Sequence, residues 1–425
     1  MKSYINPPRI VWDKLSQRPY FNANKLEKKV KKILNKIKIE GEDAVHEFNA
    51  AFDNATYKEL KVTATEIAHA ENELSDNLKQ AIRTAFQNIW KFHEAQQHTD
   101  FEMETMPGVN CMRRSVPIDA VGLYIPGGTA PLFSTLLMLA IPAKIAGCRN
   151  IVVCTPANKD GNIHPAILFV VGLLKLEYVF KIGGAQAIGA MAYGTESVPK
   201  CYKIFGPGNQ FVTAAKMLVN KDGVAIDMPA GPSEVLVVAD SYSNPNYIAA
   251  DLLSQAEHGV DSQVVLVTLD KALLNKVKKS VKQQLEFLPR KEIVQQALRK
   301  SSAIYFEAKE DAWDFINHYA AEHLIVALDN AEQYIAEIKN AGSVFLGHYT
   351  PESAGDYASG TNHTLPTGGF ARSYSGVSVD SFVKKVTYQH ITQEGLQLIG
   401  NTIEEMAAAE GLHAHKNAVS IRLRK

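Results

Sequence analysis

The sequence has no net charge, no long apolar run and few cysteines, and each absence narrows the class of protein. Lys plus Arg and Asp plus Glu both number 45 in 425 residues, so nothing in the charge favours nucleic acid or an anionic membrane as a partner. The apolar run 166–174 is too short to span a bilayer, and the first residues lack the apolar core of a signal peptide. We therefore expect a cytoplasmic protein.

The few cysteines exclude a disulfide framework. The chain has four, none with C-x-x-C spacing, and we expect all of them to be free thiols: Cys111, Cys148, Cys154 and Cys201. Hydrophobic residues make up 46% of the chain, as in ordinary globular proteins. The length exceeds what one compact core usually holds, so we expect at least two domains.

Hydrophobic periodicity predicts two α/β units. Residues 24–100 have a helical pattern with an apolar stripe. From about residue 119, short β-branched runs alternate with helical patterns, first over 119–238 and again over 239–381, which is typical of mostly parallel sheets covered by helices. We expect an α/β fold with two Rossmann-like, incompletely doubly wound domains and small helical appendages at both ends.

The expected domains follow from these segments. We assign 1–23 to an N-terminal arm, 24–118 together with 239–381 to one α/β domain, 119–238 to the other, and 382–425 to a helical tail. In the 119–238 segment, three strands end in glycine-rich turns at 125–128, 182–186 and 205–209. Such turns at the carboxyl edge of a parallel sheet suit a phosphate. None is a complete G-x-G-x-x-G, and glycine is also common between strand and helix, but three together favour a nucleotide.

Three separated segments carry metal-ligand side chains. They are SQAEHG at 254–259, SAGDYASGTNH at 353–363 and GLHAHKNAV at 411–419, and they offer Gln255, His258, Asp356, His363, His413 and His415. Imidazole with carboxylate or amide oxygen suits zinc. Each member also has an ordinary explanation. His258 could interact with carbonyls at a helix end, and Asp356, in what we expect to be a loop, could form an Asx turn.

Glu322 and His323 open the predicted strand HLIVAL. A carboxylate beside an imidazole can serve as an acid/base pair near neutral pH. Glu-His is a common dipeptide, so this pair gains meaning only from its neighbours.

These motifs together resemble the histidinol dehydrogenase family, from about residue 10 to the C-terminus. The matching segments are VGLYIPGGTAPLFST, GGAQAI, KIFGPGN, DMPAGPSEVLV, DLLSQAEHG, AEHL, AGSVFLG, ESAGDYASGTNH and LHAHKNAV. The resemblance implies the last step of histidine biosynthesis. L-Histidinol would be oxidised through L-histidinal to L-histidine by two NAD⁺, with one zinc per subunit. It also implies a homodimer in which the tail of one subunit completes the other's site.

The same resemblance implies the roles of individual residues. The zinc ligands would be Gln255, His258, Asp356 and His415, and the acid/base pair would be Glu322 and His323. The NAD⁺ contacts would be Tyr124, Gln186 and Asn209, which place the nucleotide in the 119–238 domain. The substrate contacts would be Ser233, Gln255, His258, His323, Asp356, His363, Glu410 and His415. Glu410 and His415 would act across the dimer interface.

Two positions depart from the family pattern. Ala321 stands where proline is frequent, which removes no functional group. His413 stands where a residue that does not bind metal is usual. On a helix it would point away from His415, so His415 keeps the role of ligand.

In the expected mechanism His323 accepts the alcohol proton and Glu322 activates water on the aldehyde. One alternative is a thiohemiacetal on Cys111 or Cys148, as in aldehyde dehydrogenases. Another is a zinc hydrolase with Glu322 as base, which would leave the glycine turns without a use. A dehydrogenase of a related amino alcohol also stays open. A non-catalytic binding protein would not require an acid/base pair such as Glu322 and His323.

Overall fold

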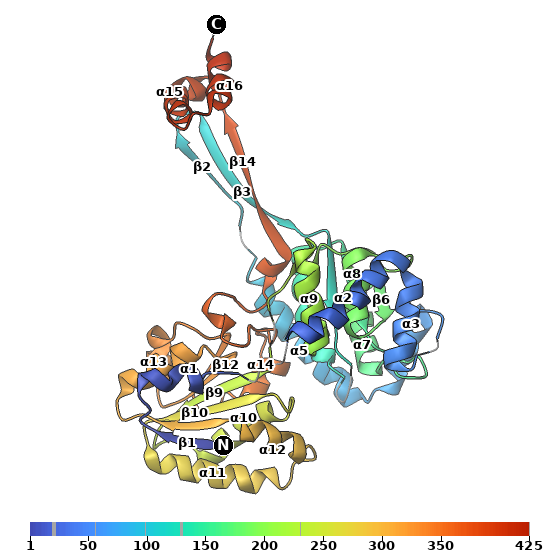
Figure 1. Cartoon of the computed structure of the whole chain (residues 1–425), viewed down its shortest axis with the longest axis vertical. Helices are drawn as coiled ribbons and strands as arrows, with labels where there is room; N and C mark the ends of the chain where they lie inside the picture. Colours follow the sequence, from blue (N-terminus) through green and yellow to red (C-terminus); the bar gives the residue numbers. More distant parts are fainter. Residues whose placement is uncertain (19–22, 56, 98, 128–130, 230, 425) are drawn as a thin grey trace.

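The structure, a computed structural model, describes the whole chain except residues 19–22, 56, 98, 128–130, 230 and 425. Two α/β units lie side by side, and a long arm projects from them (Figure 1). Residues 19–22 of the expected N-terminal arm and Gly128 of the first glycine-rich turn lie outside the described residues. Among the residues described, no helix combines the length and the apolar character needed to cross a membrane.

The first unit is built on a five-stranded, entirely parallel sheet. The strand order is β6-β5-β4-β7-β8. The strands are β4 (Ala120–Tyr124), β5 (Asn150–Thr155), β6 (Tyr178–Lys181), β7 (Lys203–Phe205) and β8 (Ala225–Ile226). Chain order runs outward from the centre in both directions, which is the doubly wound arrangement. The expected α/β class is confirmed for this segment.

Helices cover both faces of this sheet. One face carries α4 (Ala64–Ala70), α5 (Asp76–Glu94), α6 (Phe133–Ala146) and α7 (Pro165–Leu174), and the other carries α2 (Ala23–Glu40), α3 (Glu42–Asp53), α8 (Gly184–Tyr193) and α9 (Gln210–Lys221). We expected residues 24–118 to pack on the other unit, and this was wrong for its helices. The stripe of Val30, Leu34 and Ile37 meets α8 and α9 instead. An amphipathic stripe shows that a helix is covered, but it does not identify the covering element.

The second unit is built on a six-stranded parallel sheet in the order β1-β11-β10-β9-β12-β13. The strands are β1 (Lys2–Ile5), β9 (Glu234–Ala239), β10 (Gln263–Thr268), β11 (Ser302–Tyr305), β12 (His323–Ala327) and β13 (Ser343–Leu346). One face is covered by α10 (Pro245–Ala256), α11 (Lys271–Leu285) and α12 (Lys291–Arg299). The other is covered by α1 (Trp12–Leu15), α13 (Lys309–Tyr319) and the short η1 (Arg9–Val11) and η3 (Ala331–Glu337).

Two expected boundaries of this unit were wrong. The strand at 235–240, expected to close the first unit, is β9 in the middle of the second sheet. Residues 2–5, expected in a surface arm, form the edge strand β1, and Trp12 is buried in the core. The hydrophobic pattern of a single buried strand fits either sheet, so the pattern alone could not assign the strand to one unit.

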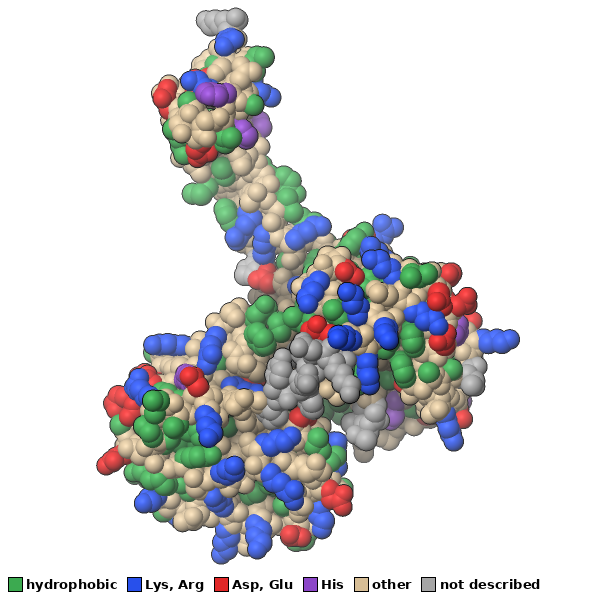
Figure 2. Space-filling view, in the orientation of Figure 1, with side chains coloured by type: hydrophobic (Ala, Val, Ile, Leu, Met, Phe, Trp, Pro, Cys, Tyr) green, Lys and Arg blue, Asp and Glu red, His purple; other side chains and the backbone are tan. Residues whose placement is uncertain are grey.

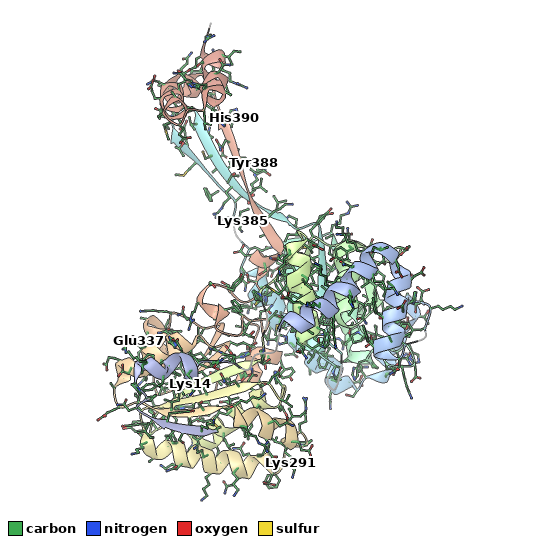
Figure 3. The ribbon with its side chains drawn as sticks, viewed as in Figure 1. Lys14, Lys291, Glu337, Lys385, Tyr388 and His390 are labelled. Atoms are coloured by element: carbon green, nitrogen blue, oxygen red, sulfur yellow. The ribbon has the colours of Figure 1, made fainter. Side chains whose placement is uncertain are left out.

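The arm consists of residues 101–117 and 383–424. Strands β2 (Phe101–Met106), β3 (Val109–Pro117) and β14 (Val383–Ile391) form an antiparallel sheet in the order β14-β3-β2, and α15 (Gln393–Ala409) and α16 (His413–Leu423) pack together at its tip. Lys385 lies near the base of the arm, with Tyr388 and His390 progressively closer to the tip (Figure 3). We expected only helices in the tail, so β14 was missed, as were β2 and β3.

Candidate active site and metal centre

The catalytic candidates meet at the amino edge of the six-stranded sheet. Glu234 and His323 are the first residues of the neighbouring parallel strands β9 and β12, and Gln255 lies in the last turn of α10, which returns to this edge. A cavity of about 910 Å³ opens beside them, lined by Ser233 and His258 of this unit and by Asn209 of the other. The site therefore lies in a cleft between the two units.

Three side chains of this edge form a cluster suited to a metal ion. Ligand atoms of His258, Glu352 and Asp356 all lie within 4.8 Å of one another. The Gln255 carboxamide is buried beside them, with its Nε2 facing the Glu352 carboxylate and its oxygen 2.8 Å from the Glu234 nitrogen, whose N–H it shares with Glu322 Oε2. Three of the predicted zinc ligands are thus brought together. Imidazole, amide and carboxylate donors suit zinc.

Glu352 belongs to this cluster and was missed by the sequence analysis. The segment around Asp356 was expected to be a loop, but Glu352–Tyr357 form the short helix α14. Glu352 and Asp356 are four residues apart and therefore share one helix face, a spacing that could have found Glu352. Its side chain is only 1% exposed, and among the described residues its Oε2 has no hydrogen-bond partner.

Replacing Glu352 with glutamine should weaken zinc binding by roughly 10- to 100-fold, because the buried carboxylate adds negative charge beside the ligands and orients Gln255. Zinc affinity is measured by competition with a chromophoric chelator. Glu337→Gln, at an exposed site in the same unit, is the matched control and should bind zinc as the parent does. Equal affinities in both variants would remove Glu352 from the metal centre.

His323 is buried among carboxylates. Its Nδ1 is 3.3 Å from the Glu234 carbonyl oxygen, 3.7 Å from Glu322 Oε2 and 3.9 Å from Glu352 Oε1, and its Nε2 is 3.6 Å from Asp356 Oδ1. Burial disfavours the charged imidazolium, but the surrounding carboxylates outweigh burial and raise the pKa of His323 to about 10. Because the Glu234 carbonyl can only accept, it favours a proton on Nδ1 and leaves Nε2 as the basic atom.

Glu322 is buried next to His323, and its Oε2 accepts from the Glu234 N–H at 2.8 Å. Burial raises the pKa of Glu322 to about 8, although His323 opposes the shift. Burial also raises the pKa of Glu352 well above its usual range. Four carboxylates, those of Glu234, Glu322, Glu352 and Asp356, thus lie at one edge. Among the described atoms, His323 Nε2 and Glu352 Oε2 have no hydrogen-bond partner. Several buried carboxylates near one imidazole, together with polar atoms that lack a hydrogen-bond partner, are what a cation-binding site provides.

Two further substrate candidates border the cleft. Ser233 lines the cavity directly before β9. His363 is already engaged on both ring nitrogens, at 2.8 Å from the Asp356 carbonyl oxygen and 3.1 Å from the Thr135 hydroxyl of the first unit. Burial lowers the pKa of His363, although the Asp356 carboxylate opposes the shift.

The predicted nucleotide contacts surround a second cavity of about 1200 Å³ at the carboxyl edge of the five-stranded sheet. Tyr124 accepts from the Gly184 N–H at 3.1 Å, and Gln186 donates to Asp53 at 3.1 Å. Asn209 caps α9 by accepting from the Phe211 and Val212 N–H groups at 3.0 and 3.2 Å. Asn209 also lines the cleft that contains Ser233 and His258, and therefore links the two cavities.

A glycine is required where β7 turns toward Asn209. Gly206 has a φ of +122°, and a Cβ there would lie 2.1 Å from the Tyr124 carbonyl oxygen. A buried ion pair braces the turn, because Asp227 accepts from the Gly206 N–H at 2.8 Å and Lys216 donates to the Gly206 carbonyl at 2.8 Å. The backbone of β4 and β7 is thereby held close at this edge.

The structure does not bring Glu410 and His415 to this site within one chain. Glu410 caps α15, and His413 and His415 lie in the first turn of α16, all exposed at the tip of the arm (Figure 1). His413 and His415 are two residues apart on one helix and point in different directions.

The two cysteines proposed as nucleophiles do not line the cavities. Cys111 is on β3 in the arm, and neither it nor Cys148 lines either cavity. Burial raises the pKa of Cys148 to about 12, which disfavours a thiolate. The arrangement therefore gives a thiohemiacetal mechanism no nucleophile in the cleft formed by the described residues.

Comparison with known proteins agrees with this arrangement. The family model described as histidinol dehydrogenase matches residues 16–423. A histidinol dehydrogenase of Bacteroides thetaiotaomicron is 57% identical over 423 residues, covering 100% of this chain and 99% of the relative, and one from an Escherichia coli O6:H1 strain is 51% identical over 412 residues, covering 96% and 94%. The crystal structure of histidinol dehydrogenase from Elizabethkingia anophelis is 54% identical, with a TM-score of 0.97 over 100% of this chain and 98% of that one. The chain belongs to the histidinol dehydrogenase family.

Proposed function

We propose that this chain oxidises L-histidinol to L-histidine through L-histidinal with NAD⁺ as oxidant, the last step of histidine biosynthesis. One observation carries the proposal. The buried pair of Glu322 and His323 adjoins the cluster of His258, Glu352 and Asp356, in a cleft that Asn209 joins to the cavity at the glycine-rich turns. An acid/base pair, metal ligands and room for a nucleotide thus occur together.

Zinc would be held by Gln255, His258 and Asp356 of one subunit and by His415 of its partner in a homodimer. Once bound, the ion would hold the imidazole and amine of the substrate, and its charge would favour a neutral His323. Ser233, His323 and His363 complete the substrate contacts within the subunit. Glu410 of the neighbouring copy would contact the substrate together with His415, because both lie at the arm's tip.

Two residues of the chain handle protons. In the first oxidation, Nε2 of His323 accepts the hydroxyl proton as hydride leaves the carbinol carbon for NAD⁺. Glu322 then takes a proton from the water that adds to the aldehyde carbon, while protonated His323 returns its proton to the carbonyl oxygen, which gives a gem-diol and a neutral His323. Loss of a second hydride to a second NAD⁺, with a proton passing to His323, yields the carboxylic acid. The cleft keeps the aldehyde bound between the two steps.

Tyr124, Gln186 and Asn209 would contact the nucleotide in the larger cavity. Its volume of about 1200 Å³ is sufficient for a dinucleotide, and its walls come from strand ends where such ligands commonly bind. A zinc hydrolase, the alternative class, needs no nucleotide and would leave this cavity without a role.

Complete turnover of a limiting amount of L-histidinol should yield about two molecules of NADH per molecule of histidinol, because both oxidations reduce NAD⁺. Absorbance at 340 nm gives the yield. Chelation should abolish turnover, and added zinc should restore it, because the cluster of donors positions the substrate. A yield of about one would indicate release of the aldehyde. No NADH at all from zinc-loaded enzyme would contradict the proposed function.

A further inference from the structure

A buried ion pair lies directly behind the catalytic pair. Arg18 Nε and Nη2 donate to the two carboxylate oxygens of Glu234 at 2.6 and 2.8 Å, and the two side chains are only 11% and 0% exposed. The guanidinium is held on three further sides. It donates to the carbonyls of Ser16 and Tyr319, each at 2.7 Å, and lies 3.7 Å from the centroid of the Tyr319 ring. This bidentate, stacked arrangement suits arginine and not lysine.

Glu234 touches Glu322 and His323 in three ways. Its N–H donates to Glu322 Oε2 at 2.8 Å, its carboxylate Oε1 accepts from the Glu322 N–H at 3.3 Å, and its carbonyl oxygen lies 3.3 Å from His323 Nδ1. The first contact orients the Glu322 carboxylate, and the third sets the ring so that His323 Nε2 faces Asp356 at 3.6 Å. A shift of Glu234 would therefore move both members of the catalytic pair.

We propose that Arg18 and Glu234 are positioning residues for Glu322 and His323, an inference that rests on the proposed function of that pair. Arg18 is the residue of the N-terminal segment that contacts Glu234. Arg18 reaches the site from the far end of the sequence and fixes the Glu234 carboxylate, and Glu234 fixes the backbone and side chain of Glu322. A buried ion pair contributes little net stability, so geometry is the better explanation for placing one here.

The ion pair could instead serve only to dock the N-terminal segment, and kinetics separate the two roles. If the pair positions the catalytic groups, Glu234→Gln and Arg18→Lys should lower kcat by roughly 10- to 100-fold, while KM for histidinol and zinc content stay within about twofold of the parent. If the pair only docks the segment, the melting temperature falls while kcat of the folded enzyme matches that of the parent, and the proposal is overturned.

Two further variants keep the test decisive should either single substitution disturb folding. Arg18→Met combined with Glu234→Gln removes both charges and leaves no unpaired buried ion; it should fold and still show the lowered kcat. Parental kcat in this variant would overturn the proposal. Arg9→Ala is the matched control, because Arg9 lies in the same segment but forms exposed ion pairs with Asp311 and Asp314. It should retain parental kcat.

Chemical rescue adds a readout that docking would not give. Arg18 lines the cleft, so a guanidinium ion can reach the space left by Arg18→Ala. Millimolar guanidinium chloride should restore kcat of this variant several-fold, and sodium chloride at equal ionic strength should not. Equal responses to the two salts would count against positioning. Failure of the parent enzyme to make NADH from histidinol would instead refute the proposed function, so the two failures are distinguishable.

Discussion

Replacing His323 with alanine should lower kcat for histidinol oxidation by roughly 100- to 10,000-fold, the range that a general base contributes. The expectation follows from the position of Nε2. Within the described part of the chain this atom has no hydrogen-bond partner, while Nδ1 faces the Glu234 carbonyl oxygen at 3.3 Å. Nε2 lies 3.6 Å from Asp356 Oδ1, so the ring is oriented with this nitrogen toward the proposed metal and substrate site. Stopped-flow absorbance at 340 nm measures the first hydride transfer directly.

A matched substitution and a second catalytic variant sharpen this test. His348→Ala removes an imidazole that pairs with Asp329 on the same unit, and it should leave kcat unchanged. Glu322→Gln should slow oxidation of histidinal more than oxidation of histidinol, because Glu322 is assigned to the water and not to the alcohol. An intact alcohol step in His323→Ala would show that another group is the base. Equal slowing of both steps in Glu322→Gln would remove its assignment to water.

Local patterns predicted the two α/β units because strand–helix alternation is encoded within short segments. The helical patterns expected between the strands of 119–238 are observed as α6, α7, α8 and α9. The docking of α2 on α8 and α9 could not be predicted, because its stripe of Val30, Leu34 and Ile37 would suit any apolar surface. The arm strands were missed for a different reason. All residues of β2 except Met106 are exposed, so it lacks the alternation that marks a half-buried strand.

The candidate site was predictable where one motif carries several donors. Gln255 and His258 share one segment, and the structure brings His258 and Asp356 together. Glu352 carried a readable signal, its spacing of four from Asp356. Arg18 carried none. It contacts Glu234 at a sequence separation of 216 residues, and only the folded sheet reveals that contact. Residues that position catalytic groups are generally recruited by tertiary structure and have no local pattern of their own.

The arm has features of a surface that a second copy covers. Apolar side chains lie along it (Figure 2), and Leu398, Met406 and Ile421 on its two helices are 57%, 61% and 61% exposed. Solvent-exposed apolar residues on a projecting element favour an interface. The arm also carries Glu410 and His415 away from the cleft of their own chain. If these residues serve the site, a partner's arm must deliver them, which requires a homodimer with shared sites.

Heterodimers of two inactive subunits should recover about half the activity of the parent dimer. One subunit carries His323→Ala and the other His415→Ala, so in a shared arrangement one of the two sites combines an intact cleft with an intact arm. Differently tagged subunits, co-expressed and purified through both tags, provide the heterodimer for the NADH assay. A second heterodimer pairs a subunit that carries both substitutions with a parent subunit. Each shared site then contains one defect, so NADH production should be nearly lost. Sites confined to single subunits would give the opposite pair of results, since only the second heterodimer would then retain an undamaged site.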